Sequence, residues 1–339
     1  MVLDAYKACS ARKTYVWEGV LKVRKLTRRE FVKLCGMSAA GLSLMSLLGP
    51  QITHALAKAV EDKVPVLWLQ GASCTGCSVS LLNTVDPSIE KVLLDVISLR
   101  YHPTISAAAG ELGMHVVEEV ADRFAGEFFL VIEGGIPVKD KGKYCFIGEI
   151  GHREITMYEA LLELGPKAKA VIAAGSCAAF GGIPGAAPNP TGVLGVDAVL
   201  NDRPWRRKHN VINISNCPLH PDHFLGTLTY VLTYNEIPEL DRYLRPKMFY
   251  QTTIHDDCPR RPDFEAGRFA RRIGDEGCLA SLGCKGFIAM SDCPKRGWNN
   301  GTNWCIAAGA PCQACSEATF PDGCSPLYGG MPVTGNRNG

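Results

Sequence analysis

Long apolar runs are scarce in this sequence. Outside the N-terminal segment, no stretch reaches the roughly 18 apolar residues that a membrane-spanning helix requires, so we expect a soluble mature chain without a transmembrane helix. The chain after residue 57, which we call the body, also lacks an excess of basic residues. Residues 1–57 hold nine of the 36 Lys and Arg and three of the 34 Asp and Glu, which leaves 27 basic and 31 acidic residues. This mildly acidic body does not indicate nucleic-acid binding.

Short apolar runs alternate with amphipathic segments up to about residue 245. This alternation predicts an α/β fold with a flavodoxin-like parallel sheet, and a Gly- and Pro-rich loop is expected over residues 181–195. The expected buried strands are residues 64–69, 92–99, 128–132, 170–174 and 211–214. The expected helices are residues 107–124, 156–164 and 221–234.

The alternation is absent after residue 246, where Gly, Pro, Asp and Cys dominate. Such a segment buries too little apolar surface to hold its own structure. Of the 15 cysteines, thirteen follow residue 57 and eight lie between Cys258 and Cys324. We expect these cysteines to hold the segment together. The predicted organisation is a signal peptide over 1–57, an α/β domain over 58–245, and a loop-rich iron–sulfur cluster domain over 246–339.

The N-terminal segment has the parts of an export signal. A basic region with Arg28-Arg29 precedes an apolar run over 34–49, and Ala55-Leu56-Ala57 provides a small-x-small cleavage site. The paired arginines followed by Phe resemble a twin-arginine signal, which predicts export to the periplasm. A membrane anchor is the alternative, but the apolar run is short for a span.

Four cysteines each follow a predicted strand: Cys74, Cys77, Cys177 and Cys217. Open α/β sheets bind ligands at the carboxyl ends of their strands, and four converging thiolates suit an iron–sulfur cube. We expect Gly76 and Gly175 to let backbone N–H groups approach the cluster sulfurs. The Cys74-x-x-Cys77 pair alone also fits a thioredoxin-like redox pair or half of a zinc site.

Eight further side chains offer two groups of four ligands: His255, Cys258, Cys278, Cys284, Cys293, Cys305, Cys312 and Cys315. The spacing does not exclude zinc, and an oxidising compartment would permit disulfides. A twin-arginine signal exports folded, cofactor-loaded proteins. Export by this route favours metal inserted before export over bridges formed afterwards.

Several motifs resemble the small subunit of nickel–iron hydrogenases, and the resemblance covers about residues 64–328. The motifs are Trp68-Leu69-Gln70-Gly71, Cys74-Thr75-Gly76-Cys77, Gly175-Ser176-Cys177, Asn216-Cys217-Pro218 and Asp292-Cys293-Pro294. The resemblance implies three iron–sulfur clusters. A proximal [4Fe–4S] cluster would be held by Cys74, Cys77, Cys177 and Cys217. A distal [4Fe–4S] cluster would be held by His255, Cys258, Cys278 and Cys284. A medial cluster would be held by Cys293, Cys312 and Cys315.

One position departs from many of these subunits, which carry Pro after Asn-Trp and hold a medial [3Fe–4S] cluster. Here the motif is Asn303-Trp304-Cys305. The extra thiolate resembles the nickel–iron–selenium branch, in which the medial cluster is [4Fe–4S]. We therefore predict three [4Fe–4S] clusters with Cys305 as the fourth medial ligand. A medial [3Fe–4S] cluster is the alternative.

The family's reaction is reversible oxidation of hydrogen at a nickel–iron site in a large partner subunit. This chain lacks the paired Cys-x-x-Cys motifs of such a partner. No catalytic residue is therefore assigned to it, and the resemblance implies electron relay to an external carrier, a cytochrome. The alternatives are a cluster-bearing subunit of a related quinone reductase and a secreted disulfide-bonded binding protein.

A few chemically distinctive residues fall outside these motifs. We interpret Cys145 as a small buried apolar residue, and Cys324 has no assigned role. Glu133 ends the third predicted strand at the same sheet edge as the cysteines, and it is interpreted as an ordinary strand-end acid, with a role at the subunit interface as the alternative. His220 follows Cys217 and is interpreted as structural, with a hydrogen bond near the cluster as the alternative.

Overall fold

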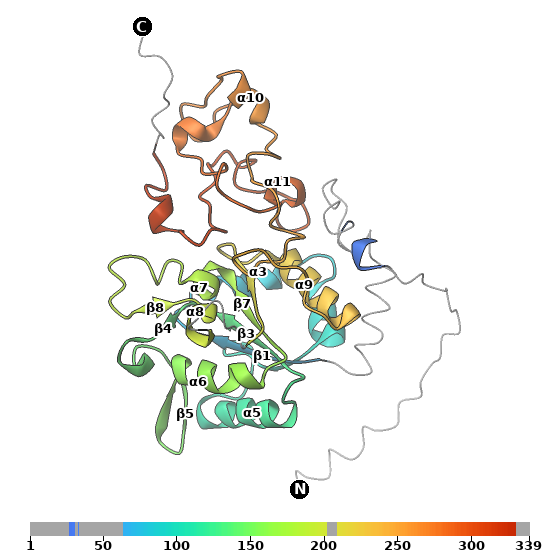
Figure 1. The fold of residues 1–339 in the computed structure, drawn as a ribbon, viewed down its shortest axis with the longest axis vertical. Helices are drawn as coiled ribbons and strands as arrows, with labels where there is room; N and C mark the ends of the chain where they lie inside the picture. The colour runs from blue at the N-terminus through green and yellow to red at the C-terminus, as the bar shows by residue number, and fades with distance from the viewer. Residues whose placement is uncertain (1–26, 31–32, 34–63, 202–208, 330–339) are drawn as a thin grey trace, which may run out of the picture.

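The computed structural model describes residues 27–30, 33, 64–201 and 209–329. The predicted cleavage site at 55–57, together with Cys9 and Cys35, lies outside the described residues. A layered α/β part fills the lower half of the molecule in Figure 1, and a loop-rich part stands above it. No helix in the described ranges is long and apolar enough to cross a membrane.

Five parallel strands form the central sheet in the order β2-β1-β3-β7-β9. In the order in which these five strands occur along the chain, this is 2-1-3-4-5, so the expected flavodoxin-like α/β fold is confirmed. The strands are β1 (Val64–Gln70), β2 (Ile97–Tyr101), β3 (Phe129–Glu133), β7 (Ala170–Ala174) and β9 (Val211–Ile214). The register pairs Gln70 with Glu133, and Glu133 with Ala174. The strand ends are therefore level, and the residues that follow them share one edge of the sheet.

The second strand begins later than predicted. Residues 92–96 belong to a π-helical turn, η2 (Val92–Val96), which follows α4 (Ile89–Lys91). An apolar run fits a buried helical turn as well as a strand, and Val92 and Val96 are both buried in the core. The other four strands match the predicted segments within one residue at each end.

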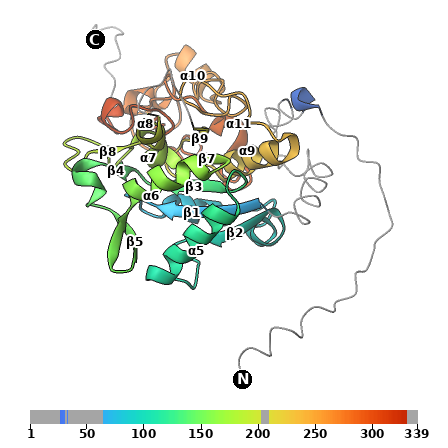
Figure 2. The same ribbon diagram turned by 60° about the horizontal axis from the view of Figure 1, so that its bottom comes forward.

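Helices cover both faces of the sheet, as Figures 1 and 2 show. Alternate side chains of each strand point to opposite faces. Val66 and Trp68 of β1 therefore pack with α3 (Gly76–Leu82) and α9 (Pro221–Tyr234). Leu67 and Leu69 pack with α5 (Gly110–Arg123) and α6 (Met157–Leu164). Because both faces are covered, the strands read as continuous apolar runs in the sequence.

Local signals fix where two of these helices begin. Thr156 and Glu159 form a reciprocal capping box at the start of α6. Pro221 occupies the first turn of α9, where its missing N–H costs nothing, and His220 Nδ1 accepts from the N–H of Asp222. The predicted helices at 156–164 and 221–234 are thus observed at those positions.

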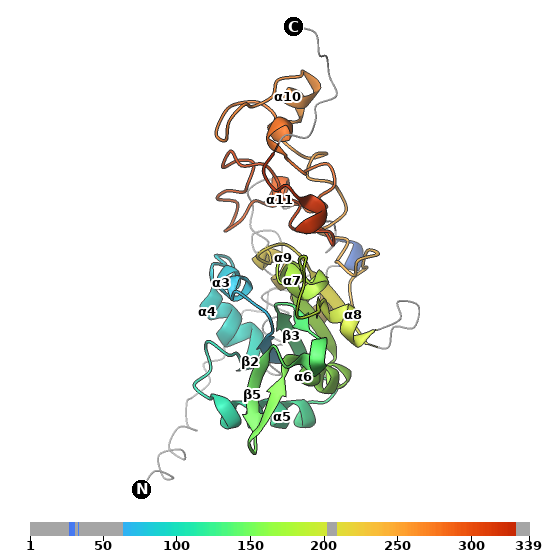
Figure 3. The same ribbon diagram turned by 90° about the vertical axis from the view of Figure 1, so that its left-hand side faces the viewer.

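Two small antiparallel pairs complete the layered part. The hairpin of β5 (Phe146–Ile150) and β6 (Arg153–Thr156) projects from it in Figure 3. β4 (Ile136–Pro137) pairs with β8 (Val193–Leu194), which ties down the end of the Gly- and Pro-rich loop. This loop follows α7 (Gly175–Phe180) and precedes α8 (Val196–Leu200).

Residues 250–329 contain little regular structure. Their helical segments are α10 (Arg261–Glu265), η6 (Leu279–Leu282), α11 (Cys293–Arg296) and η7 (Asp322–Cys324). Four of the eleven buried residues in their apolar cluster are cysteines: Cys284, Cys293, Cys312 and Cys324. Figures 1 and 3 place this part beyond the edge of the sheet at which α3 and α7 begin.

Candidate metal centres

The four cysteines predicted at the sheet edge lie together. Cys74 and Cys77 occupy the connection from β1 to α3, Cys177 lies in α7 after β7, and Cys217 follows β9. Burial raises the pKa of Cys217 to about 12, and the neighbouring Cys177, Cys315 and Cys74 contribute. Burial also raises the pKa of Cys77, with Glu133, Cys177 and Cys217 adding to the effect. The topology thus brings residues 140 positions apart in the sequence into one group.

Glycines leave space beside these sulfurs. A Cβ atom on Gly175 would lie 2.4 Å from Cys77 Sγ, and one on Gly182 would lie 2.9 Å from Cys177 Sγ. Both glycines also have positive φ angles, +84° and +50°, which L-residues with side chains rarely adopt. At Gly76 the corresponding distance to Cys74 Sγ is 3.1 Å. These positions leave open the space beside the sulfurs that a bound cluster needs.

Backbone N–H groups are directed at several cysteine sulfurs. Leu219 N donates to Cys77 Sγ at 3.4 Å, and Ala314 N donates to Cys312 Sγ at 3.4 Å. Burial raises the pKa of Cys177, and a backbone hydrogen bond from Ile183 opposes this rise. Such donors stabilise a thiolate and tune iron–sulfur sites.

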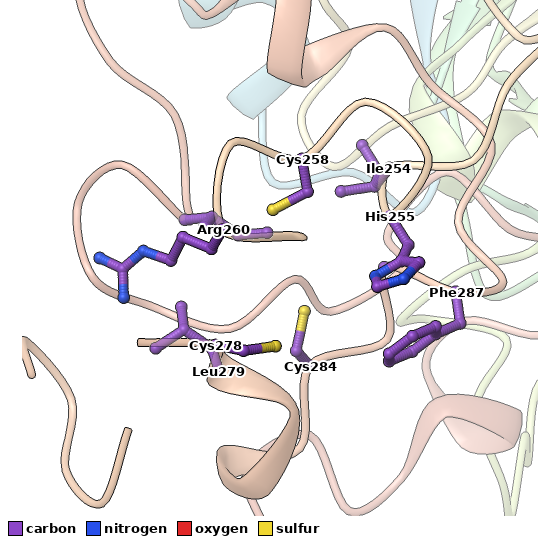
Figure 4. A pocket seen from close by; sticks show the side chains of 10 residues that line it. Ile254, His255, Cys258, Arg260, Cys278, Leu279, Cys284 and Phe287 are labelled. Carbon is purple, nitrogen blue, oxygen red and sulfur yellow. The ribbon is translucent and has the colours of Figure 1, made fainter. Parts of the chain in front are cut away.

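A second group lines a small cavity at the far end of the loop-rich part. His255, Cys258, Cys278 and Cys284 contribute to its wall. In Figure 4 the three sulfur atoms and the imidazole ring point into the same space. All four predicted distal ligands are therefore brought together from separate loops.

Four further cysteines, Cys293, Cys305, Cys312 and Cys315, form a third group. Burial raises the pKa of Cys293 to about 12, and Cys315 and Cys305 are among the neighbours that contribute. Burial also raises the pKa of Cys312, with Cys315, Cys284 and Cys293 adding to it. Cys305 is an exposed residue, yet burial of its thiol raises its pKa as well.

The three groups form a continuous row. At one end, the backbone of Cys217 donates a hydrogen bond to the Cys315 thiol, whose pKa burial raises to about 11. At the other end, Cys284 of the cavity contributes to the raised pKa values of Cys305 and Cys312. The group containing Cys293 therefore lies between the sheet edge and the cavity.

The chemistry of these donor sets fits iron–sulfur clusters. All thirteen cysteines in the described residues are free thiols, so the disulfides considered from the sequence do not form among them. Within the same residues, no three His, Cys, Asp or Glu side chains are arranged to hold a metal ion. Thiols with raised pKa values need a bound metal to become thiolates near neutral pH.

Hydrogen bonds join the layered α/β part to the loop-rich part beside the three ligand groups. Ser176 Oγ donates to the carbonyl of Cys315. Arg245 donates to the carbonyl of Ser316 and to Glu317 Oε1, both at 3.0 Å. Asp292, next to Cys293, accepts from the buried side chains of His223 at 2.6 Å and Arg296 at 2.6 and 2.9 Å. Most of these partners are 69 to 139 residues apart, and no sequence pattern indicated them.

Two further contacts were missed by sequence reasoning. The rings of Phe287 and Phe264 pack on His255, with ring centroids 4.1 and 4.9 Å from the imidazole. Glu133 is buried rather than an ordinary strand-end acid, and it accepts the N–H of Cys77 at 3.0 Å. Its position as the last residue of β3, at the sheet edge where Cys74 and Cys77 follow β1, was the available signal.

The other residues singled out from the sequence have different surroundings. Cys145 packs partly buried against the core. Cys324 is buried, with Thr319 Oγ1 3.8 Å from its sulfur. The ring of His220 bonds to the carbonyl of Gly297 and to the N–H of Asp222.

Comparisons with known proteins agree with this division of the chain. Residues 250–328 match the family described as the C-terminal part of the NiFe/NiFeSe hydrogenase small subunit. Residues 74–231 match the family described as NADH ubiquinone oxidoreductase, 20 Kd subunit.

Full-length relatives extend the match over most of the chain. The periplasmic [NiFeSe] hydrogenase small subunit of Desulfomicrobium baculatum is 45% identical and aligns with 89% of this chain and 98% of its own length. The periplasmic [NiFe] hydrogenase small subunit 1 of Nitratidesulfovibrio vulgaris is 41% identical and aligns with 90% of this chain and 94% of its own length. The uptake hydrogenase small subunit of Azotobacter vinelandii is 40% identical and aligns with 89% of this chain and 82% of its own length.

Solved structures give the same result. A structure of the H2-activated [NiFeSe]-hydrogenase from Dm. baculatum superimposes with a TM-score of 0.76 at 45% identity, covering 80% of this chain and all of that chain. The recombinant [NiFeSe] hydrogenase from Desulfovibrio vulgaris Hildenborough gives a TM-score of 0.75 at 46% identity, covering 79% of this chain and 98% of that chain.

Proposed function

Because this chain belongs to the small subunits of NiFe/NiFeSe hydrogenases, we propose that it relays electrons during reversible oxidation of H2. It is part of a heterodimeric oxidoreductase. The electrons pass between the nickel–iron site of the large subunit and an external carrier, which we propose to be a cytochrome. No residue of this chain takes part in splitting H2.

The single observation that supports the relay is the continuous row of twelve potential ligands from the sheet edge to the distal cavity. We propose that Cys74, Cys77, Cys177 and Cys217 hold the proximal [4Fe–4S] cluster. We propose that Cys293, Cys305, Cys312 and Cys315 hold the medial cluster. We propose that His255, Cys258, Cys278 and Cys284 hold the distal [4Fe–4S] cluster. When bound, iron–sulfur clusters supply one-electron transfer at potentials set by charge, hydrogen bonds and exposure.

The chain's own residues prepare these positions in two ways. Glycine at position 175 leaves room beside Cys77 Sγ, and N–H groups such as that of Leu219 stabilise thiolate charge. His255 is neutral where a cysteine ligand would be anionic. It therefore reduces the negative charge of the distal site, which raises its reduction potential relative to a site of four cysteines.

Cys305 supports a medial [4Fe–4S] cluster and membership in the selenium-containing branch. Its thiol is a neighbour of Cys293 and Cys315. A fourth thiolate at this position would retain the iron that three thiolates leave unsupported. Relatives at 45% identity that are named [NiFeSe] hydrogenase small subunits favour the same branch.

We further propose export to the periplasm, with residues 1–57 as a twin-arginine signal, 58–245 as the α/β domain and 246–339 as the cluster domain. Two of the relatives are named periplasmic. N-terminal sequencing of the mature subunit should begin at Lys58. A mature subunit that retains Arg28 would contradict this processing.

The relay is tested on the purified heterodimer by Mössbauer and electron paramagnetic resonance (EPR) spectroscopy. Alanine variants of Cys177, Cys312 and Cys258 should each remove or alter one cluster and leave the other two. Cys145→Ala is the matched control, because this cysteine packs against the core and should leave all three clusters intact. Three clusters that survive every ligand substitution would refute the assignment. Quinone reduction without H2 oxidation would favour the quinone reductase alternative.

A further inference from the structure

The ring of His255 is held differently from the rings of the buried histidines. His102, His220 and His223 all use ring nitrogens in hydrogen bonds. Within the part of the chain that the structure describes, neither ring nitrogen of His255 has a hydrogen-bond partner. A histidine that binds a metal usually donates its second ring N–H to a carboxylate, a carbonyl or water, and this bond fixes the direction of the ring. Another kind of contact must therefore orient His255.

The backbone fixes the position of His255 but leaves the direction of its ring open. The His255 N–H donates to the carbonyl of Gly286 at 2.9 Å, which ties it to the residue before Phe287. The last side-chain torsion of a histidine has a broad, roughly two-fold preference. The imidazole could thus turn toward or away from the cavity unless its neighbours prevent it.

Two phenylalanine rings contact the imidazole at different angles. The Phe287 ring has its centroid 4.1 Å from that of His255, with 33° between the ring planes. The Phe264 ring has its centroid 4.9 Å away and is nearly perpendicular, at 81°. Figure 4 shows the Phe287 ring beside the imidazole at the wall of the cavity. Because the two contacts differ in orientation, they restrict different rotations of the imidazole.

The two phenylalanine rings are themselves held in place. They pack on each other with centroids 5.2 Å apart, and Phe264 also packs on Phe269 at 5.9 Å. The backbone of Phe269 forms a parallel bridge with that of Cys278. Phe264 lies in α10, which begins three residues after Cys258. This aromatic cluster is therefore attached to the segments that carry two other proposed distal ligands.

We propose that Phe264 and Phe287 are positioning residues of the distal site, which direct the His255 imidazole into the cavity by ring packing. They take the part that a hydrogen bond to the second ring nitrogen has at most histidine ligands. This inference rests on the proposed function, because it assumes that His255 is a ligand. Without the Phe287 ring, the imidazole can turn away from the cavity, which weakens its hold on a bound cluster.

The test compares Phe287→Leu with Phe269→Leu in the purified heterodimer, reduced under anaerobic conditions. Both variants remove a half-buried ring of the same cluster and keep an apolar side chain, but the ring contacts of Phe269 are with Phe264. Pulsed EPR measures the coupling of the imidazole nitrogen to the distal cluster. Phe287→Leu should change this coupling and lower the retention of the distal cluster against an iron chelator about tenfold. Phe269→Leu should match the wild type in both measurements.

Phe287→Tyr provides a second measurement, because it keeps a ring of the same shape and should restore the wild-type coupling and retention. A role in folding alone would lower the retention of all three clusters and leave the nitrogen coupling of the loaded protein unchanged.

An unchanged coupling in loaded Phe287→Leu overturns the inference, as does an altered coupling in Phe287→Tyr. If Phe287→Leu fails to load a distal cluster, Phe264→Leu is measured in its place, and a wild-type coupling there overturns the inference. An imidazole coupling that survives His255→Ala would instead refute the ligand set proposed for the distal site, and with it this inference.

Discussion

Replacing Gly175 by alanine should damage the proposed proximal site while leaving the sheet intact. The new Cβ atom would lie 2.4 Å from Cys77 Sγ, whereas non-bonded carbon contacts are favourable near about 3.5–4.0 Å. The residue also has φ of +84°, in the region that favours glycine. The substitution therefore combines backbone strain with a direct overlap on a proposed ligand.

A substitution at a second glycine separates the free-energy cost of the backbone strain from that of the overlap with the sulfur. The left-handed backbone costs an alanine about 1–2 kcal/mol, and overpacking a tight site costs about 1–3 kcal/mol more. Gly126 has a similar φ of +79°, but no atom lies within 4 Å of a Cβ built there. Gly126→Ala should therefore show only the first cost. The difference between the variants isolates the overlap with the sulfur.

The assay is the loss of the proximal EPR signal from the heterodimer during incubation with an iron chelator. If the overlap acts on the site, the loaded form of Gly175→Ala should be weakened relative to Gly126→Ala by about 1–3 kcal/mol. Since about 1.4 kcal/mol corresponds to a factor of ten, this is roughly tenfold or more in the retention equilibrium. Medial and distal signals should be lost at equal rates in both variants. Equal proximal retention in the two variants would refute the sheet-edge location of this centre.

Other predictions concern the remaining groups. Cys305→Pro should give the EPR signal of an oxidised [3Fe–4S] cluster, and a strong signal of this kind in anaerobic wild-type protein would contradict Cys305 as the fourth medial ligand. His255→Cys should lower the distal potential and slow dye reduction more than isotope exchange at the partner's site, and an equal fall in both would contradict the relay role. Asp292→Ala should destabilise the protein by about 3–5 kcal/mol in denaturant titration, because it removes the carboxylate that pairs with the buried side chains of His223 and Arg296, and a loss below about 1 kcal/mol would contradict this account. Iron removal should make residues 250–329 sensitive to proteolysis before residues 64–201, and the reverse order would show that burial alone holds the loop-rich part.

The sheet was predictable because both of its faces are covered. β7 is apolar at every position and β3 at every position before Glu133, and both stand between amphipathic helices, so the sequence pattern is unambiguous there. The pattern failed at residues 92–96, where a buried π-helical turn and a strand have the same apolar composition. An uninterrupted apolar run indicates burial, but it does not by itself distinguish a strand from a buried helical turn.

The ligand groups were predictable in part, and their supporting residues were not. Cys177 and Cys217 follow strands, so parallel topology alone brings them to one edge. The loops that bring His255 and Cys284 to one cavity have no such rule, and their grouping came from resemblance. The contact of Phe287 with His255, and the hydrogen bond from the Cys77 N–H to Glu133, depend on packing between distant segments. No local pattern in the sequence encodes such packing.

Three polar contacts between the two parts of the molecule share one property: each involves the chain neighbour of a proposed ligand. Ser176 precedes Cys177 and binds the carbonyl of Cys315. Arg245 binds the carbonyl of Ser316, the residue after Cys315. Asp292 precedes Cys293 and receives hydrogen bonds from His223.

Because the loop-rich part has little regular structure, its placement against the sheet relies on these contacts. Each contact is separated from a proposed ligand by at most one peptide unit, and a peptide unit is stiff. A displacement at the contact is therefore transmitted directly to the ligand. The same interactions that join the two parts thus also set the position of the proposed medial ligands relative to the sheet edge. Substitutions at Ser176 or Arg245 should consequently alter electron relay even though neither side chain is a proposed ligand.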